Sequence, residues 1–403
     1  MEGKCPPYGD SLYSLGKQRS PCFEEITMIV LWWAAAILLF LSFAGYPLFL
    51  LVFVRKVERH DCPSDYQPHV SLIIPARNEA GVIEAKLCNT LALEYPRDRL
   101  EIWVVSDGSV DDTDSIIRRF ESEGVNKIRF EESRGKTEAQ NEAVRRSRNE
   151  ILLFSDANAM YDQQAVRKLT RHFYHSDVGC VSGQLLYERL GGPPDIEETV
   201  YWRYEKGLKK LENRIEAIPG VNGSIYAVRR SDYVFLEPDI ISDFIEPLEI
   251  ARKGKKVVYE PEALSIEPPP VNLCQEFRRK RRIVSRSVRS LLSHRHLMNP
   301  FQHPMIAASL FFHKVLRWMS PLIMLVLFAA TLSLFSGGRF RIALILQILF
   351  LFLGALGFLF RNKREIPTWI FVPYYVLLLG AASLLGMYDA FTGRAPQVWT
   401  PSR

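Results

Sequence analysis

The sequence predicts an α/β domain with a mostly parallel sheet, joined to one N-terminal and about three C-terminal helices that cross a membrane or lie on it. Two observations support this fold class. Between about residues 70 and 270, short runs rich in β-branched residues alternate with amphipathic stretches, as in a parallel sheet covered by helices on both faces. Long apolar stretches flank this region. The 403 residues, 48% hydrophobic and 24% charged, suit a globular part combined with a membrane-embedded part.

The first apolar stretch runs from Thr27 to Val54 without a charged residue. It is longer than the roughly 20 residues needed to cross a bilayer, so we expect a transmembrane helix at 27–54. The preceding polar segment, 1–26, contains prolines and several charges, which is untypical of a cleaved signal peptide. The basic residues Arg55, Lys56 and Arg59 follow. The positive-inside rule therefore places the next domain in the cytoplasm, in a multi-pass protein of the inner (plasma) membrane.

Polar clusters follow three of the expected strands. VSLIIP is followed by Arg77, Asn78 and Glu79, LEIWVVSD ends in Asp107 before Gly108 and Ser109, and EILLFSD ends in Asp156 before Asn158. Ligands of parallel sheets bind beyond the carboxyl ends of the strands, so the three clusters are expected at one edge. The alternative interpretation is that these residues form turns and cap the helices that follow.

Four stretches occur in order along the chain: SLIIPARNEA, VVSDGSVDDT, RGKTEAQNEA and LLFSDANA. Together they resemble family 2 glycosyltransferases, most closely the membrane-bound branch of cellulose, chitin and hyaluronan synthases and bacterial exopolysaccharide enzymes. The resemblance implies a cytoplasmic domain with the GT-A fold at 68–271. It also implies a hexosyltransferase that uses a nucleotide sugar, most simply a UDP-sugar.

The same resemblance assigns the donor-binding residues, which are Pro75, Arg77, Glu79, Asp107, Gly108, Ser109, Lys136 and Asp156. Asp107 lies where the family contacts the uracil, and a carboxylate suits this role because uracil N3–H is a donor. Lys136 would touch the diphosphate as a point charge. Its alternative interpretation is a solvated lysine in a loop.

Asp156 and Asn158 match the family's metal-binding DxD motif, with an amide in place of the second acid. Mg²⁺ or Mn²⁺ prefers oxygen ligands and is often held by one or two carboxylates together with substrate phosphates. Such an ion would neutralise the charge on the departing nucleoside diphosphate. Because Asn158 adds no charge, we expect weak metal affinity before the donor binds.

Asp243 lies at the catalytic-base position in ISDFIEPLEIARKGKKVVYEP, which resembles the family's TED or EDD segment. A carboxylate there takes the proton of the acceptor hydroxyl, and attack opposite the leaving group implies inversion. Ser242 stands where many members have a second acid, so Asp243 must act alone. Glu246 is the fallback, and the alternative is that Asp243 only caps its helix.

The stretch EFRRKRRI matches the position of the QxxRW motif of processive synthases, with Arg279 for the glutamine, Arg282 for the arginine and Ile283 for the tryptophan. Arginines can hold diphosphate oxygens bidentately. The loss of the tryptophan removes a ring that would stack on the acceptor, which argues against processive polymerisation. The region 272–313 is expected to form basic interfacial helices, and contact with anionic headgroups is the alternative role of the arginines.

Four residues are expected on the acceptor side. Tyr201 and Trp202, in an amphipathic stretch, would present rings to a sugar or to the lipid interface, with core packing as the alternative. Gly223 and Ser224 lie where the family closes the acceptor side of the site.

The C-terminal region, 314–390, contains three apolar runs, at Val315–Phe335, Ile342–Phe360 and Trp369–Met387, and is expected to be transmembrane. Pro373 in the third run allows it to lie in the interface instead. A tail follows at 391–403. Four crossings from an outside N-terminus would place this tail outside, whereas a role in catalysis would require it in the cytoplasm.

The expected function is metal-dependent, inverting transfer of a sugar to a polysaccharide or glycolipid acceptor at the inner membrane. Single addition to a polyprenyl-linked acceptor is the alternative among enzymes. A membrane transporter or channel with a nucleotide-binding sensor domain is the alternative of another class. The net charge of +6, concentrated in RRKRR at 278–282, indicates a local basic site and no nucleic-acid partner.

Overall fold

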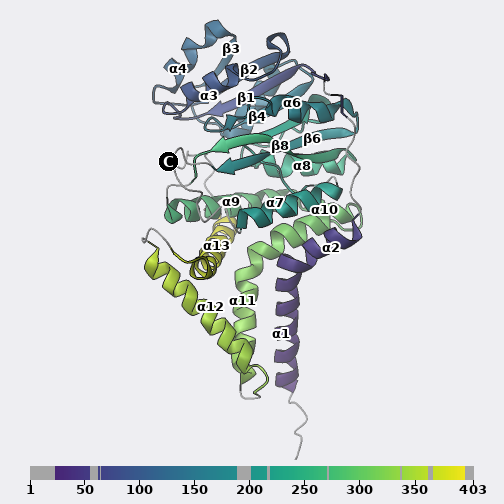
Figure 1. The fold of residues 1–403 in the computed structure, drawn as a ribbon, viewed down its shortest axis with the longest axis vertical. Helices are drawn as coiled ribbons and strands as arrows, with labels where there is room; N and C mark the ends of the chain where they lie inside the picture. Colours follow the sequence, from purple (N-terminus) through teal and green to yellow (C-terminus); the bar gives the residue numbers. More distant parts are fainter. Residues whose placement is uncertain are drawn as a thin grey trace, which may run out of the picture.

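The computed structural model shows an α/β domain above a layer of crosswise helices, with long apolar helices below (Figure 1). The structure describes residues 23–54, 62–63, 65–187, 201–215, 218–269, 272–335, 338–361 and 366–394. Most of the polar segment predicted at 1–26 and of the tail predicted at 391–403 lies outside the described residues.

Eight strands in the described part of the chain form one sheet, in the order β3-β2-β1-β4-β7-β6-β8-β5. They are β1 Val70–Ala76, β2 Leu100–Asp107, β3 Val125–Phe130, β4 Ile151–Ser155, β5 Met160–Tyr161, β6 Val178–Tyr187, β7 Ile225–Arg229 and β8 Lys256–Glu267. β7 is antiparallel to both β4 and β6, and β8 is parallel to β6. Because two reversals restore the direction, β6 and β8 run the same way as the parallel strands β1 to β4. The predicted, mostly parallel fold class is confirmed, with β5 and β7 making the sheet mixed.

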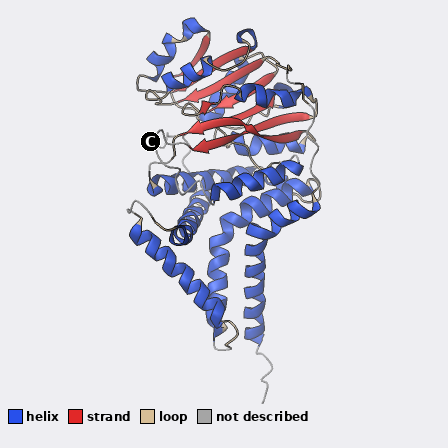
Figure 2. Cartoon of the chain, viewed as in Figure 1, coloured by secondary structure: helices blue, strands red, loops and turns tan. Residues whose placement is uncertain are grey.

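Helices cover both faces of this sheet (Figure 2). One face packs against α3 Ile83–Leu91, α4 Thr113–Arg119 and α6 Ala165–Thr170, and the other against α5 Lys136–Arg146 and α8 Ser242–Arg252. Alternate residues of β1 enter the two cores, since Leu72 belongs to the first and Ile73 to the second. β1 is buried at every position, as expected of a strand with helices on both faces.

A layer of helices, here called the platform, lies between the sheet domain and the long apolar helices (Figure 1). It consists of α2 Tyr46–Phe53, α7 Tyr201–Glu212, α9 Leu273–Ser293 and α10 Pro304–Ser309. The outer side of α8 joins it through a separate apolar core that includes Leu248, Leu291 and Ile306. The side chain of Asn272 caps α9 by accepting a hydrogen bond from the Gln275 amide at 2.9 Å.

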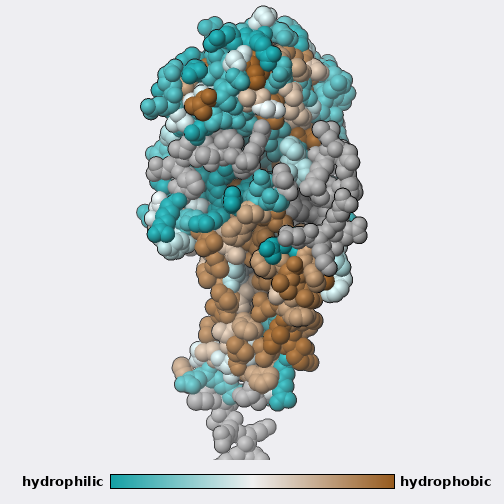
Figure 3. Space-filling model, turned by 90° about the vertical axis from the view of Figure 1, so that its left-hand side faces the viewer, coloured by the Kyte–Doolittle hydropathy of each residue, from teal (hydrophilic) through white to brown (hydrophobic). Residues whose placement is uncertain are grey.

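Four described helices are long and apolar enough to cross a membrane, namely Phe23–Phe53, Pro304–Ser333, Arg341–Phe360 and Thr368–Phe391. The first comprises α1 Phe23–Phe40, the π-helix η1 Leu41–Gly45 and α2, and the second comprises α10, the π-helix η9 Leu310–Val315 and α11 Leu316–Ser333. Such π segments are common places for a helix to bend, and each separates a platform helix from a steep helix (Figure 1). A band of apolar side chains lies below the polar upper part (Figure 3).

The last helix, α13 Thr368–Phe391, lies along the platform helix α9. The Tyr375 hydroxyl donates to Glu276 Oε1 at 3.3 Å, and Asp389 accepts from Arg281 Nε and Nη2 at 2.6 and 2.8 Å. A Cβ at Gly386 would stand 2.7 Å from the Arg281 carbonyl oxygen, so glycine permits the close approach of the two helices. Both the middle and the end of α13 therefore contact α9, which favours the interfacial alternative for the third apolar run.

The helix bounds differ from the predicted boundary between an interfacial region 272–313 and a membrane region 314–390. The helix Pro304–Ser333 runs through this boundary without a break, because Pro304 can open a helix at its first turn and apolar residues follow at once. The division of the chain into domains stays a proposal.

Candidate active site

A cavity of about 820 Å³ lies at the edge of the sheet where β4, β6 and β8 end. These strand ends, the first turns of α5 and α8, and the platform helices α7 and α9 form its wall. Asp156 follows β4, Tyr187 ends β6 and Glu267 ends β8. The common direction of the three strands brings these side chains to one opening, at the edge where the sequence placed a ligand site.

The predicted metal ligand and the predicted base face this one cavity. Lys136 Nζ lies 2.5 Å from Asp156 Oδ1 and donates to the Gly223 carbonyl oxygen at 3.3 Å. A Cβ at Gly223 would stand 2.0 Å from Asp243 Oδ2 and 3.3 Å from Lys136 Nζ. The three charged side chains therefore gather around Gly223, and only a residue without a side chain fits among them.

Burial and charge set the protonation of this cluster. Burial raises the pKa of the Asp243 carboxyl, the Lys136 charge opposes this rise, and Asp156 adds to it. Burial lowers the pKa of Lys136, but the charges of Asp156 and Asp243 outweigh burial and the net pKa is raised, so the side chain stays an ammonium. A carboxylate with a raised pKa is a stronger base. Asp243 is therefore suited to accept a proton next to a fixed positive charge.

Oxygen donors for a divalent cation are present at Asp156 and Asn158, both of which line the cavity. No group of three or more His, Cys, Asp or Glu side chains that could hold a metal occurs among the described residues. Two oxygen ligands fit a hard cation that takes its other ligands from water and substrate phosphates. Because Lys136 already neutralises part of the Asp156 charge, the ion is expected to bind together with a phosphate-bearing ligand.

Asp107 has a supporting position behind the cavity wall. Its carboxylate accepts hydrogen bonds from Ser133 Oγ at 2.7 Å, Arg134 N at 2.6 Å and Gly135 N at 3.0 Å. These bonds hold the turn that begins α5 with Lys136. In this conformation Asp107 positions the lysine, and its contact with a uracil stays a prediction.

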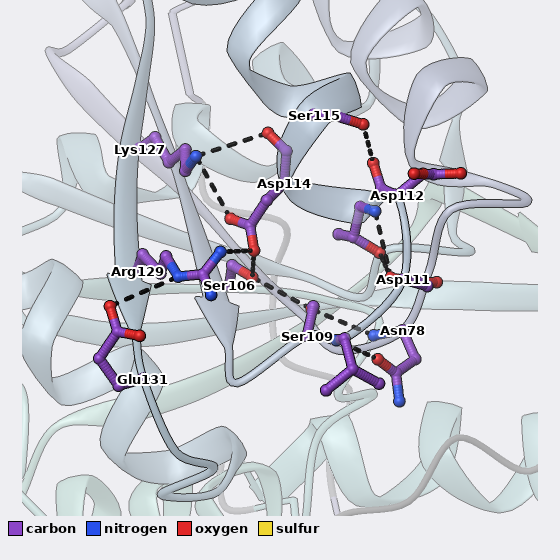
Figure 4. A network of polar contacts seen from close by, with 12 residues as sticks. Asn78, Ser106, Ser109, Asp111, Asp112, Asp114, Ser115, Lys127, Arg129 and Glu131 are labelled. Atoms are coloured by element: carbon purple, nitrogen blue, oxygen red, sulfur yellow. Dashed lines mark hydrogen bonds and ion pairs between the residues drawn. The ribbon is translucent and has the colours of Figure 1, made fainter.

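The loops after β1 and β2 are tied to each other (Figure 4). The Asn78 amide donates to Ser109 Oγ at 3.2 Å, and Asn78 Oδ1 accepts from the Val110 amide at 3.0 Å. Asp114 accepts from Ser106 Oγ at 3.2 Å and pairs with Arg129 at 2.7 Å, which extends the network to β3. The network fixes the edge from which Glu79 reaches the cavity.

The other predicted residues fall into two groups. Those that line the cavity are Glu79, Lys136, Asp156, Asn158, Gly223, Ser224, Asp243, Arg279 and Arg282. Those that do not are Pro75, Arg77, Asp107, Gly108 and Ser109, which lie within, end or follow β1 and β2. Tyr201 and Trp202 belong to α7, but their side chains lie outside the described part of the structure.

Arg279 and Arg282 project into the cavity from α9. Arg279 pairs with Glu276 at 2.8 Å and donates to the Tyr187 hydroxyl at 2.5 Å, so its guanidinium is held in place at the end of β6. Burial lowers the pKa of Arg282, and the charges of Arg286 and Arg279 lower it further. Three cations on one helix face therefore crowd one wall of the cavity.

The fallback base, Glu246, is wrongly placed for catalysis. Its side chain is fully buried and does not line the cavity. Burial raises its pKa to about 8, so the group is an uncharged acid in the core at neutral pH. Position 246 lies one turn after Asp243 along α8, where its side chain is buried in the core, whereas Asp243 lines the cavity.

Sequence reasoning missed seven charged residues of the cavity, namely Glu205, Lys206, Lys209, Glu267, Lys280, Arg286 and Lys314. Burial and the Asp156 charge raise the pKa of Glu267 to about 7. A signal for Arg286 was present, because residues 279, 282 and 286 share one helix face by their spacing. Lys209 and Lys314 come from other helices, and only the packing of α7 against η9 and α9 brings them here.

Comparison with protein families decides the class of this domain. Residues 71–234 match the model described as glycosyl transferase family 2. These residues form a family 2 glycosyltransferase domain. The predicted resemblance to family 2 is confirmed for these residues, and the predicted GT-A fold class is confirmed. Sugar transfer by the chain as a whole stays a proposal.

Relatives and solved structures agree with this assignment. The chain is 24% identical over 241 residues to poly-beta-1,6-N-acetyl-D-glucosamine synthase of Staphylococcus aureus (strain MSSA476), covering 54% of this chain and 58% of the relative. It is 28% identical over 218 residues to the probable glycosyltransferase YdaM of Bacillus subtilis (strain 168), covering 51% of each. The chain thus spans about half the length of the curated relatives it matches.

The fold of the glycosyltransferase domain with its helices is similar to that of a solved structure. This is the mannosyltransferase PcManGT from Pyrobaculum calidifontis in complex with GDP-Man and Mn²⁺, with a TM-score of 0.66 and 22% identity. The match covers 91% of this chain and 98% of that one. The similarity therefore extends beyond the sheet domain to the helices that carry it.

Proposed function

We propose that the chain is a membrane-bound, metal-dependent, inverting glycosyltransferase. It transfers a sugar from a nucleotide sugar, most simply a UDP-sugar, to a polysaccharide or glycolipid acceptor. The observation that carries this proposal is the common cavity in which Asp156, Lys136 and Asp243 surround Gly223. Similarity to a polysaccharide synthase supports the class of acceptor.

The donor diphosphate would bind between β4 and α9. Lys136 approaches it from α5, and Arg279 and Arg282 approach from α9. Asp156 and Asn158 would hold Mg²⁺ or Mn²⁺, which supplies positive charge to the leaving nucleoside diphosphate. The cations of the chain itself screen the same charge and orient the donor before the reaction.

Asp243 would act on the acceptor hydroxyl. A hydroxyl hydrogen-bonded to Asp243 loses its proton to the carboxylate while its oxygen attacks the anomeric carbon, and the nucleoside diphosphate departs from the opposite side. A single base and a single displacement invert the configuration. Asp243 is half-buried, and restricted access of water strengthens the electrostatic contacts of such a site.

Single addition is the favoured form of this reaction over processive polymerisation. Ile283 lines the cavity in place of the tryptophan of the processive motif, so this position offers no ring on which a growing polymer would stack. We propose a cytoplasmic catalytic domain at about 68–271 on platform helices, anchored in the inner membrane. The apolar helices support membrane attachment.

Transfer from radiolabelled UDP-sugars to membrane lipids or polymer, measured on the purified protein in nanodiscs with Mn²⁺, tests the proposal. We expect incorporation from one UDP-sugar, lost on chelation of the metal and at least a hundredfold slower in Asp156→Ala. Asp98→Asn is the matched control, because Asp98 is exposed and distant in sequence from the strand ends that form the cavity. Full incorporation in Asp156→Ala would refute the role of this residue.

A further inference from the structure

The membrane-facing wall of the cavity is basic. Lys209 reaches it from α7, Arg286 from α9 and Lys314 from η9. Lys314 belongs to the helix Pro304–Ser333, which is long and apolar enough to cross a membrane. The cavity therefore extends from the strand ends of the catalytic domain to the beginning of a membrane helix.

Positive charges outnumber negative ones in the lining of the cavity, where eight lysines and arginines face five aspartates and glutamates. Lys209 Nζ donates to Asn222 Oδ1 at 2.7 Å, a neutral partner. Burial and the Lys314 charge lower the pKa of Lys209 to about 8, although Glu205, Glu212 and Asp243 act in the opposite direction. Glu205 also lines the cavity, but its carboxylate is engaged by Arg317 and His313.

Arg286 adds a third positive charge. Burial lowers its pKa, although Asp243 and Asp239 attract it. The charge of Arg286 also lowers the pKa of Arg282, which lies one turn earlier on α9. Buried like charges that repel one another are stabilised by a bound anion, which removes both the repulsion and part of the cost of burial.

The donor diphosphate does not account for this anion site. The donor is placed by Lys136, Asp156 and Arg279, whereas Lys314 stands on the platform side of the cavity. The volume of about 820 Å³ lies in the upper part of the range of roughly 300–1,000 Å³ seen for ligand sites. The cavity is therefore large enough for a donor and the head of an acceptor together.

We propose that Lys209, Arg286 and Lys314 form a second anion subsite, which holds the phosphate of a lipid-linked acceptor beside Asp243. This inference rests on the proposed function and names the class of its acceptor: an alcohol joined through a phosphate to a lipid tail. Ile283, which is 43% exposed, and Phe244 also line the cavity and give it apolar surface for the beginning of that tail. A neutral polysaccharide would leave the surplus of positive charge in the lining of the cavity uncompensated.

Calorimetric binding of dodecyl phosphate to the full-length protein in phosphatidylcholine nanodiscs tests this subsite. Saturating UDP and Mn²⁺ fill the donor side, and empty nanodiscs give the background of lipid partitioning. Inorganic phosphate supplies the anion without a tail, and dodecyl maltoside supplies the tail without an anion. We expect dodecyl phosphate to bind at least tenfold more tightly than either.

Lys314→Gln and Lys209→Gln are each expected to weaken dodecyl phosphate binding at least tenfold, because each removes a charge-assisted hydrogen bond. Lys253→Gln, at the exposed end of α8, is the matched control and should stay within twofold. Unchanged binding in both cavity variants would overturn the subsite. Equal affinity for inorganic phosphate and dodecyl phosphate would contradict the proposal that the bound phosphate belongs to a lipid.

UDP binding with Mn²⁺, measured on the same samples before the lipid phosphate is added, separates the two proposals. Loss of lipid phosphate binding with UDP affinity within twofold of wild type supports the subsite in a folded protein. Failure of the wild type to bind UDP would contradict the proposed function, whatever the result with dodecyl phosphate.

Discussion

Gly223 is the residue on which the geometry of the site depends most directly. A Cβ at this position would stand 2.0 Å from Asp243 Oδ2 and 3.3 Å from Lys136 Nζ, and the carbonyl oxygen of Gly223 accepts from Lys136. The sequence placed Gly223 on the acceptor side through its family resemblance. It gave no reason for a glycine, because the crowding of Asp243 and Lys136 appears only when α8 and α5 are folded against β7.

We expect Gly223→Ala to lower the transfer rate at least a hundredfold, because the added methyl group would stand 2.0 Å from Asp243 Oδ2 and must displace it. Gly207→Ala is the matched control: a Cβ there meets nothing within 4 Å, and position 207 lies inside α7. Alanine favours a helix over glycine by about 1 kcal/mol, so the control should keep activity and unfold at a slightly higher temperature. Equal rates for the two variants would contradict the packing described for Gly223.

The pH dependence of the reaction follows from the raised pKa of Asp243. A base works only when ionised, so activity should be lost as the pH falls through the pKa of Asp243, which burial places above the usual aspartate range. The measurement is the acid limb of kcat against pH with saturating donor. The residual activity of Asp243→Asn should lack this limb, and a limb that persists in the variant would assign it to another group.

At the scale of elements, α3 holds the loop that carries the predicted metal ligands. Asn89 exchanges two hydrogen bonds with the backbone of Tyr161, at 2.9 and 2.8 Å. Lys86 is buried, donates to the Ala159 carbonyl oxygen at 2.5 Å and lies over the Tyr161 ring. Burial lowers the pKa of Lys86 to about 7. The loop after β4 is thus fixed from behind by a helix that does not enter the cavity.

We expect Asn89→Ala to weaken Mn²⁺-dependent UDP binding roughly tenfold. Mutation of a residue that holds metal ligands in position typically lowers metal affinity or activity 10- to 100-fold. Cys88→Ala changes the exposed neighbour on the same helix and should bind UDP like the wild type. Titration of UDP at fixed Mn²⁺ measures both. A normal affinity in Asn89→Ala would show that the loop keeps its position without α3.

The sequence predicted the strands and helices better than it predicted the contacts between them. The strands from Val70 to Ser155 were expected from apolar runs between turns, and their polar ends do gather at one edge. Glu246 shows what the sequence could not predict, because residue spacing alone does not tell which turn of α8 lies in the core. Lys314 is a second case: it interrupts an apolar run, and only the bend at η9 brings its helix beneath the cavity.

At the scale of the whole molecule, the position of α13 sets the number of membrane crossings. Tyr375 and Asp389 both contact α9, so α13 lies along the platform. We propose that α1, α11 and α12 Arg341–Phe360 are the crossing helices, in which case the end of α13 lies on the same side as the catalytic domain. This topology would remove the conflict over the tail that arises from counting four crossings.

Labelling with a membrane-impermeant maleimide tests this topology. Arg394→Cys, after the end of α13, should react in inside-out vesicles together with Cys88, which is exposed on the catalytic domain. Arg341→Cys, at the beginning of α12, should react only in intact spheroplasts. Reaction of Arg394→Cys in spheroplasts would show that α13 crosses the membrane.

We propose that Asp243 activates the acceptor in the same cavity in which Asp156 holds the donor. UDP affinity with Mn²⁺ and the rate of sugar transfer in Asp243→Asn, measured on the same nanodisc sample, test this division of roles. We expect UDP affinity within about threefold of wild type and a rate lowered about 10²- to 10⁴-fold, the usual contribution of a general base. Transfer within tenfold of wild type, or a loss of rate matched by an equal loss of UDP binding, would contradict it.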